Sequence, residues 1–408
     1  MRRLVCLLLA AYVFAIPWEY SLDLGQLWGN VARVIGLLLV AAGVPALLGP
    51  ERTLRVGRMQ ALVLALFLWL CLTTFWSIDQ AVTLAKLRAF FQEMMVVFLV
   101  WEFARTPHAL RWLLRTAVAG CWVLALLTLA EFRSVEAIAE QQLRAAAFGQ
   151  DPNDVARFLD LGLPLAALLG RTEAQRSVRW MALGYLPVAL LAALLTASRG
   201  GLLAAVVALV GSTVLLLEGR RTLQRASLLA FPALLATIWI AVPAGVLERL
   251  ATIPEQLQAG NLNERVNIWQ QGWHTFRQAP LLGYGAGNFT LATGLRMEDT
   301  AHNTALALVV AGGLVALFLA TLLAALAVHT AWKLTGPLRT ALLTALAVFA
   351  VTTVAASVEE NRFTWLLVAL VALSGRLNRE APEELSACFA DPEPLPAKPA
   401  TTTAAETP

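Results

Sequence analysis

Hydrophobic residues are grouped along this chain into long runs that are separated by short polar connections. The runs lie at about residues 3–17, 31–49, 59–76, 88–104, 110–130, 155–170, 180–197, 200–217, 226–246, 303–328, 340–358 and 363–377. A helix rises about 1.5 Å per residue and needs about 20 apolar residues to cross a hydrocarbon core of about 30 Å. The pattern predicts an all-α polytopic membrane protein with about 12 transmembrane helices.

The shortest of these connections is Ser198-Arg199-Gly200-Gly201. A single helix running through it would place Arg199 near the middle of the membrane, where a charged side chain is costly. We therefore predict a tight hairpin between residues 197 and 200.

Lysine and arginine are concentrated in alternate connections, which is typical of connections on the cytoplasmic side. Examples are Arg52, Arg55 and Arg58; Arg105, Arg111 and Arg115; Arg171, Arg176 and Arg179; and Arg220, Arg221 and Arg225. The alternation holds only if residues 197–200 form a hairpin. It predicts that both termini are cytoplasmic and that the remaining connections face the periplasm.

Composition agrees with a membrane protein and excludes several other classes. Hydrophobic residues make up 59% of the chain and charged residues 14%, whereas soluble domains are about 45–50% apolar and about 25% charged. The formal net charge of +4 is spread over the connections, which indicates topology signals rather than nucleic-acid binding. The four cysteines have no C-x-x-C spacing, so neither a disulfide framework nor a zinc site is predicted.

Beyond Arg379 the sequence becomes rich in Pro, Ala, Thr and Glu. Such a segment buries too little apolar surface to fold alone. We therefore expect a transmembrane domain over residues 1–378 and a disordered cytoplasmic tail over residues 379–408.

The long polar connection at 247–302, between the ninth and tenth predicted helices, lies on the predicted periplasmic face. Within it, Val266, Trp269, Trp273 and Phe276 recur at three- and four-residue steps, which predicts a helix lying along the membrane interface. The later Gly283-Tyr284-Gly285-Ala286-Gly287 follows a proline and matches no nucleotide-binding motif. We interpret it as a turn.

Two arginines on the predicted periplasmic face are candidates for binding phosphate. Arg199 and Arg265 each carry a planar guanidinium, which matches phosphate oxygens with two parallel hydrogen bonds. The alternatives are that Arg199 anchors the hairpin at the interface and that Arg265 lies on the polar face of its helix.

His302 is the candidate base. It stands at the start of the tenth predicted helix, where the positive end of the helix dipole disfavours a charged imidazolium. The alternative is a histidine that only caps the helix. No Asp-x-Asp or His-Glu-x-x-His motif occurs, so no metal site is predicted.

The polar motifs follow one another in a recognisable order within residues 1–378. They are Arg144, Phe148-Gly149 and Asp151-Pro152-Asn153; Thr196-Ala197-Ser198-Arg199-Gly200-Gly201; Arg265-x-x-x-Trp269; Pro280-Leu281-Leu282-Gly283-x-Gly285-x-Gly287-x-Phe289; and Ala301-His302-Asn303 with Ala311-Gly312-Gly313-Leu314. No single motif is specific. The ordered set, with its large external loop before the tenth helix, resembles the O-antigen ligase and polymerase superfamily.

This resemblance implies a fold like that of the C-type glycosyltransferases and an inverting transfer that needs no metal or cofactor. The donor would be a glycan linked to undecaprenyl diphosphate, and the acceptor would be lipid A-core, in lipopolysaccharide biosynthesis at the periplasmic face of a bacterial inner membrane. It further implies that Arg199 and Arg265 hold the diphosphate, that His302 deprotonates the acceptor hydroxyl, and that Arg144 and Asn153 support substrate binding.

Three functions remain open at this point. The first is an O-antigen ligase. The second is another transferase with the same donor, either an O-antigen polymerase or a protein O-oligosaccharyltransferase. The third is a bicarbonate-type transporter, which would place charged groups along a path through the middle of the membrane, whereas the candidates here collect on one face.

Overall fold

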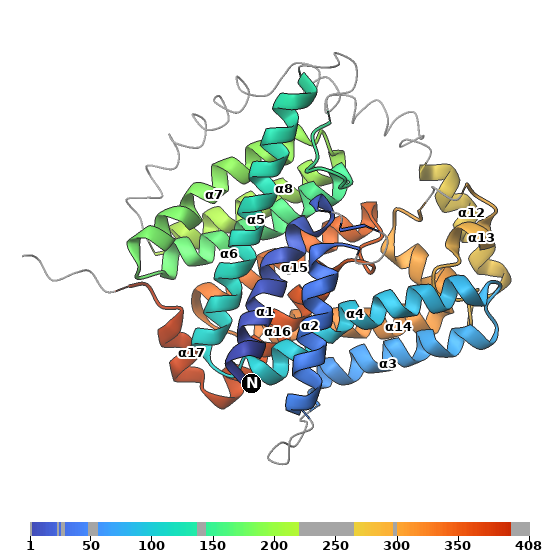
Figure 1. Ribbon diagram of the computed structural model, residues 1–408, viewed down its shortest axis with the longest axis horizontal. Helices are drawn as coiled ribbons and strands as arrows, with labels where there is room; N and C mark the ends of the chain where they lie inside the picture. Colours follow the sequence, from blue (N-terminus) through green and yellow to red (C-terminus); the bar gives the residue numbers. More distant parts are fainter. Residues whose placement is uncertain are drawn as a thin grey trace, which may run out of the picture.

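The computed structural model describes residues 2–22, 24–25, 29–47, 56–136, 144–219, 265–296 and 300–392. These residues form helices joined by turns, with no β-strand among them (Figure 1). The N-terminal half contains α1 (Arg2–Ala15), η1 (Ile16–Ser21), α2 (Val31–Leu47), α3 (Arg58–Leu72), η2 (Thr73–Phe75), α4 (Gln80–Phe103), α5 (Pro107–Glu136), α6 (Pro152–Thr172), α7 (Arg176–Leu195) and α8 (Arg199–Leu217). The C-terminal half contains α12 (Arg265–Gln278), α13 (Phe289–Thr293), α14 (Thr304–Trp332), α15 (Gly336–Ala355), α16 (Arg362–Glu380) and α17 (Pro382–Cys388).

The predicted all-α class is confirmed. Each predicted apolar run that falls within the described residues overlaps one of these helices. The predicted run at 226–246 lies outside the described residues. Seven described helical segments are long and apolar enough to cross a membrane. They are Arg3–Ser21, Arg58–Phe75, Pro107–Phe132, Arg176–Leu195, Arg199–Leu217, Thr304–Trp332 and Gly336–Ala355. The chain is therefore a multi-pass membrane protein, and its orientation in the membrane stays a prediction.

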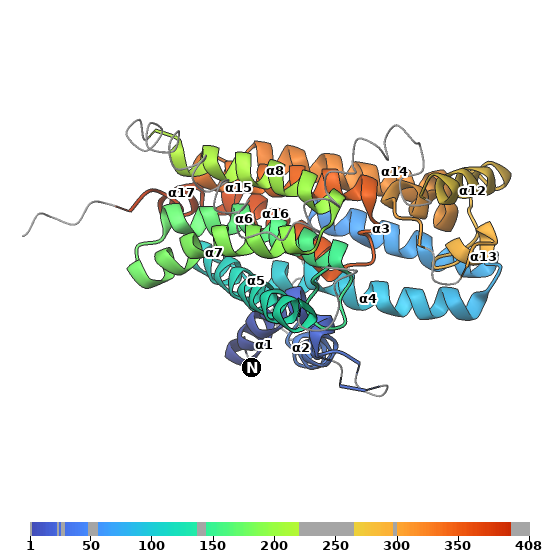
Figure 2. The same cartoon turned by 90° about the horizontal axis from the view of Figure 1, so that it is seen from above.

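Two helices lie inside the bundle rather than at its surface. Nearly every residue of α6 and α16 is buried, and α6 packs against α7, α8 and α15 while α16 packs against α4 (Figure 2). Both are interrupted by charged residues, and buried charges need partners. One such pair joins distant parts of the chain, because Arg362 at the start of α16 forms a buried ion pair with Glu19 of η1.

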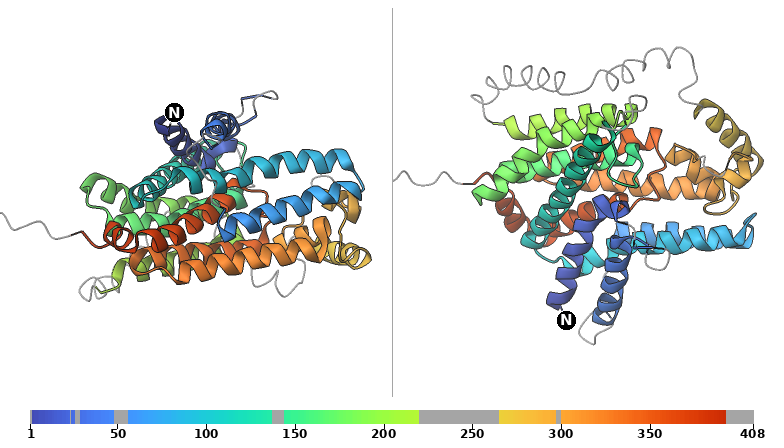
Figure 3. Two further views of the ribbon diagram at one scale, coloured as in Figure 1. Left: turned by 90° about the horizontal axis from the view of Figure 1, so that it is seen from below. Right: turned by 45° about the horizontal axis from the view of Figure 1, so that its top comes forward.

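The predicted hairpin at residues 197–200 is confirmed. Helix α7 ends at Leu195 and α8 begins at Arg199. Between them Ala197 has a positive φ of 50°, a left-handed conformation that reverses the chain but is uncommon for residues other than glycine. On the far side of the bundle, α1 packs against α2 and α5 (Figure 3).

Helix α14 is broken in its interior at Gly312 and Gly313, which have non-helical backbone angles. A break inside a membrane helix must have its freed backbone groups satisfied by protein. Here the indole Nε1 of Trp69 donates to the Gly312 carbonyl (2.7 Å). The amides of Tyr284 and Gly285 donate to the carbonyls of Val310 and Ala311 (2.8 and 2.9 Å). Carbonyl groups freed by the break therefore accept hydrogen bonds from α3 and from the glycine-rich segment after α12.

That glycine-rich segment is a structural turn, as predicted. Gly283, Gly285 and Gly287 all have positive φ, and the turn is fixed by Asn288, whose buried Nδ2 donates to Ser77 Oγ (2.8 Å) and Thr83 Oγ1 (2.9 Å). Because the amides of Tyr284 and Gly285 already bind α14, they are occupied within the fold.

The segment after residue 379 differs in part from the disorder that we expected. Helix α17 follows α16, and its Leu385 is buried together with Phe389. The guanidinium of Arg111 lies 5.2 Å from the centre of the Phe389 ring, and Arg171 pairs with Asp391 (3.0 Å). Apolar residues four apart give this stretch one face that packs on the bundle, although its overall composition is polar. Residues 393–408 lie outside the described residues.

We expect Gly313→Ala to destabilise the protein far more than Gly294→Ala. Both glycines have positive φ, near 65° and 69°, so each substitution carries a backbone cost of about 1–2 kcal/mol. A Cβ on Gly313 would also collide with the backbone of Leu281, whereas one on Gly294 would meet nothing within 4 Å. The measurement is the thermal unfolding midpoint of each purified variant in detergent. Equal decreases would show that the contact at the α14 break does not constrain the fold.

Candidate active site

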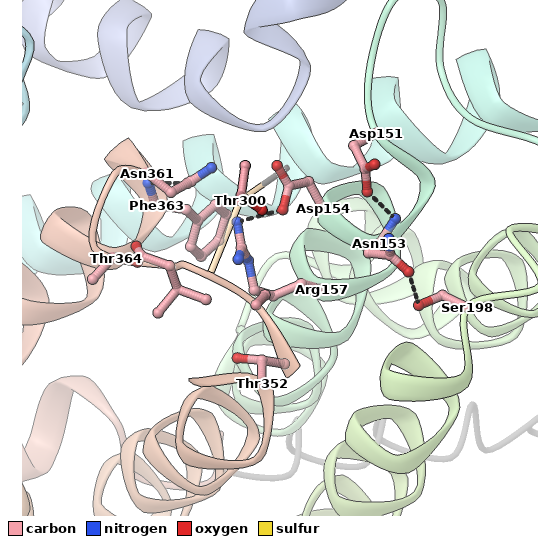
Figure 4. A network of polar contacts seen from close by, with 12 residues as sticks. Asp151, Asn153, Asp154, Arg157, Ser198, Thr300, Thr352, Asn361, Phe363 and Thr364 are labelled. Atoms are coloured by element: carbon pink, nitrogen blue, oxygen red, sulfur yellow. Dashed lines mark hydrogen bonds and ion pairs between the residues drawn. The ribbon is translucent and has the colours of Figure 1, made fainter. Parts of the chain in front are cut away.

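Asn153 is the centre of a polar network at the amino-terminal ends of α6 and α8. Its Oδ1 accepts hydrogen bonds from Arg144 Nη2 (3.2 Å) and Ser198 Oγ (2.8 Å), and its backbone amide donates to Asp151 Oδ1 at the N-cap of α6 (2.7 Å). Figure 4 shows the contacts of Asn153 with Asp151 and Ser198. Two of the predicted site residues, Arg144 and Asn153, are thus in direct contact with each other and with the Ser198-Arg199 hairpin.

The hairpin holds Arg199 as the first residue of α8. Ser198 caps this helix, since its Oγ accepts from the Gly201 amide (3.1 Å), and Arg144 Nε donates to the Thr196 carbonyl (3.2 Å). A Cβ at Gly201 would press on Ala156 of α6, and one at Gly200 would lie 3.2 Å from Ala355 of α15. The glycines therefore allow α8 to begin in close contact with α6 and α15.

Arg157 of α6 is a site residue that the sequence reasoning missed. Its side chain is 3% exposed, its Nη2 pairs with Asp154 Oδ1 (2.9 Å), and its Nη1 has no hydrogen-bond partner among the described residues. It lines a small cleft together with Asn153, Ser198 and Arg265. The available signal was a charged residue inside an apolar run, which is often functional in membrane proteins.

Arg265 begins α12 and lies on the other side of this cleft. Burial and the positive charge of Arg199 lower the pKa of Arg265 from its ordinary value, and the Asp151 carboxylate opposes this effect. The two arginines predicted to hold a diphosphate therefore lie within range of an electrostatic interaction.

His302 lies on a turn that is attached to this region at two points. Trp269, one helical turn after Arg265 on α12, donates its Nε1 to the Ala301 carbonyl (3.1 Å). Thr304 Oγ1 donates to the carbonyl of Ala356 (2.8 Å), which itself lines the cleft. His302 is not among the residues that line the cleft.

The backbone at His302 has a positive φ of 45°, and the helix cap itself is the next residue, Asn303, whose Oδ1 accepts from the Leu306 amide (2.9 Å). The capping role that was the alternative for His302 therefore belongs to Asn303. The Nδ1 of His302 lies 3.3 Å from Thr300 Oγ1, and Thr300 is drawn with the network of Asp154 and Arg157 in Figure 4.

Comparison with known proteins found a family match within the chain. Residues 185–321, about a third of the chain, match the family model described as O-antigen ligase. This segment is therefore similar to O-antigen ligases, which supports the resemblance seen in the order of the motifs. The match covers Arg199, Arg265 and His302, while Arg144 and Asn153 precede it. A search of curated proteins found no match to the chain.

The cleft is lined by two cationic side chains, those of Arg157 and Arg265. Arg144 belongs to the Asn153 network beside it, and Arg199 begins the helix that Ser198 caps. Among the described residues of this region, Asp154 pairs with Arg157. A cleft lined by two guanidinium groups favours an anionic ligand.

The segment before α16 adds a buried carboxyl group near the His302 turn. Glu359 is 9% exposed, and burial, together with the neighbouring Glu360, raises its pKa to about 8. The amide of the preceding residue, Val358, donates to Thr304 Oγ1 (3.0 Å), and the positive charge of Lys86 opposes the rise in pKa. The raised pKa favours the protonated form of Glu359 in the folded protein.

We expect Glu359→Gln to become progressively more stable than the wild type as the pH rises from 5 to 8. The folded protein holds the Glu359 proton up to about pH 8, whereas the unfolded chain releases it near its ordinary value, so the wild type loses stability over this interval. Thermal unfolding midpoints across the pH range test this, with the exposed Glu384→Gln as the control. Parallel profiles for wild type and Glu359→Gln would contradict the expectation.

Proposed function

We propose that this protein is an O-antigen ligase, which transfers a polysaccharide from undecaprenyl diphosphate to lipid A-core at the periplasmic face of a bacterial inner membrane. The observation that carries the proposal is a cleft lined by Arg157, Arg265 and Ser198, the residue that caps the helix beginning at Arg199. The positive charge of Arg199 contributes to the lowered pKa of Arg265. Cations gathered in this way are stabilised by a ligand with two or more negative charges.

A diphosphate ester supplies such charge, and more develops on it during the reaction. As the bond between the anomeric carbon and the phosphate oxygen breaks, its electron pair stays on the phosphate. Arg199 and Arg265 stabilise this leaving group without a metal ion, in the way that fixed positive groups stabilise developing anions elsewhere. The partly unpaired guanidinium of Arg157 is placed to add a further hydrogen bond.

His302 acts on the other substrate. The acceptor hydroxyl attacks the anomeric carbon from the side opposite the departing diphosphate, which inverts the configuration, and His302 takes the hydroxyl proton and passes it to water. The attachments of its turn to Trp269 and Ala356 support a position beside the arginines but outside the phosphate cleft. Arg144 and Asn153 serve the site by holding the hairpin that carries Arg199.

We expect Arg265→Lys to reduce the rate of transfer roughly 100-fold or more, because an ammonium keeps the charge but loses the planar pair of donors. Arg199→Ala should lose at least as much. Arg277→Lys is the matched control, since Arg277 is exposed on the same helix, and it should be active. The measurement is label transferred from undecaprenyl-diphosphate-linked glycan to lipid A-core by equal amounts of each purified variant. Wild-type rates in Arg265→Lys and Arg199→Ala would remove both from phosphate binding.

We expect His302→Ala and His302→Gln to lower transfer by about 10²–10⁴-fold while donor binding stays nearly intact, because the arginines hold the diphosphate. Glutamine can hydrogen-bond the acceptor hydroxyl but cannot accept its proton. His274→Gln, on the exposed face of α12, should be active. Retained transfer by His302→Ala would exclude the base role.

The same assay separates the possible functions of this site. A ligase moves the label onto lipid A-core, a polymerase lengthens the glycan on the lipid carrier, and a protein O-oligosaccharyltransferase moves it to protein. A transporter does none of these. Label that grows on the carrier would replace ligase by polymerase and leave the roles of the arginines unchanged.

A further inference from the structure

A second cavity lies at the opposite end of the bundle from the candidate active site. Its volume is about 530 Å³, within the range of about 300–1,000 Å³ that is usual for ligand pockets. It lies between the start of α3 and the ends of α14 and α16. Helix α14 begins beside His302 and ends beside this cavity, so the two sites are separated by roughly 40 Å at 1.5 Å per residue.

The charged side chains that line this cavity are all basic. They are Arg58, Lys333 and Arg379, and His329 lies with them. Among the described residues none of these three cations forms an ion pair, and two acids at this end pair elsewhere, Glu102 with Arg105 and Glu380 with Arg376. Three cations around one cavity favour an anion.

Gln60 provides an independent indication of a ligand. It lines the cavity, its side chain is 1% exposed, and neither its Oε1 nor its Nε2 has a hydrogen-bond partner among the described residues. Buried amides are nearly always hydrogen-bonded, so an unpaired one needs an explanation. An oxygen of a bound ligand would accept from Nε2.

The amino-terminal end of α3 adds further donors. Its N-cap, Gly57, lines the cavity and provides no side-chain hydrogen bond to the first turn. The first amides of a helix have no partner within the helix, and with the helix dipole they form a site that suits phosphate.

We propose that this cavity binds a phosphate group, carried by a membrane phospholipid or present as a free phosphate. The cations supply the charge, and Gln60 and the start of α3 supply hydrogen bonds to the phosphate oxygens. Both α3 and α14 are long and apolar enough to cross the membrane, so the cavity lies where a membrane helix emerges. Leu326 and Ala372 also line it and offer apolar surface to the glycerol and first acyl carbons of a lipid.

The test uses the full-length protein in detergent and follows its thermal unfolding midpoint, which rises as a ligand binds the folded state. The probes are dioctanoyl phosphatidylglycerol, inorganic phosphate and dioctanoylglycerol, which has the same tails without phosphate. We expect a saturable rise with the phosphate-bearing probes and none with dioctanoylglycerol. A rise with phosphatidylglycerol alone identifies a lipid headgroup as the ligand, and a rise also with inorganic phosphate identifies the free ion.

Substitutions then test whether the rise in the unfolding midpoint comes from binding in this cavity. Arg379→Gln should raise the half-saturating concentration about tenfold, because it removes one charge-assisted contact to the phosphate. Gln60→Leu should weaken binding without a change in net charge. Arg176→Gln, an exposed arginine at the start of α7 outside the cavity, should bind like the wild type. An equal rise with dioctanoylglycerol, or wild-type binding by Arg379→Gln, would overturn the proposal.

Discussion

Guanidinium groups that lie close together at the edge of a hydrocarbon layer repel one another, and this repulsion is the constraint on which the candidate site depends. Burial and the positive charge of Arg199 lower the pKa of Arg265, and water cannot screen partly buried charges fully. Asp151 offsets part of the repulsion, while the carboxylate of Asp154 is committed to Arg157. A bound diphosphate would relieve what remains. An anion bound at this site would therefore stabilise the folded protein, because a ligand that binds only the folded state adds its binding free energy to the stability.

Holding like charges together requires a rigid backbone, and this rigidity comes from side-chain hydrogen bonds. Asn153 joins Arg144 to Ser198 through one carbonyl oxygen, and Ser198 in turn caps the helix that carries Arg199. None of these bonds is strong alone, since a buried hydrogen bond contributes about 1 kcal/mol. Together, however, these hydrogen bonds fix the starts of α6 and α8 relative to each other. Asn153 therefore sets the position of the hairpin that carries Arg199.

The sequence predicted those parts of the structure that depend on local pattern. Apolar runs located the helices, and the cost of burying Arg199 located the hairpin. Contacts between residues far apart in the sequence leave no local pattern. The sequence therefore predicted the motifs around Asn153 separately but not the hydrogen bonds that join them. Arg157 was missed because it falls within an apolar run that reads as an ordinary helix. The α14 break was not expected, since the residues flanking Gly312 and Gly313 favour a continuous helix. Helix α17 was not predicted because the composition around the buried Leu385 and Phe389 is polar.

The break in α14 explains how His302 and Arg265 are kept in register although they belong to different segments. Helix α12 is attached to the start of α14 by the bond from Trp269 to Ala301, and the turn that follows α12 is attached lower down, at the break, by the amides of Tyr284 and Gly285. One attachment would allow α12 to pivot about it. Two attachments at different heights along the same helix prevent that rotation. The unwound turn at Gly312 therefore supplies carbonyl groups that an intact helix would have used internally, and these groups set the position of an arginine at the far end of α12.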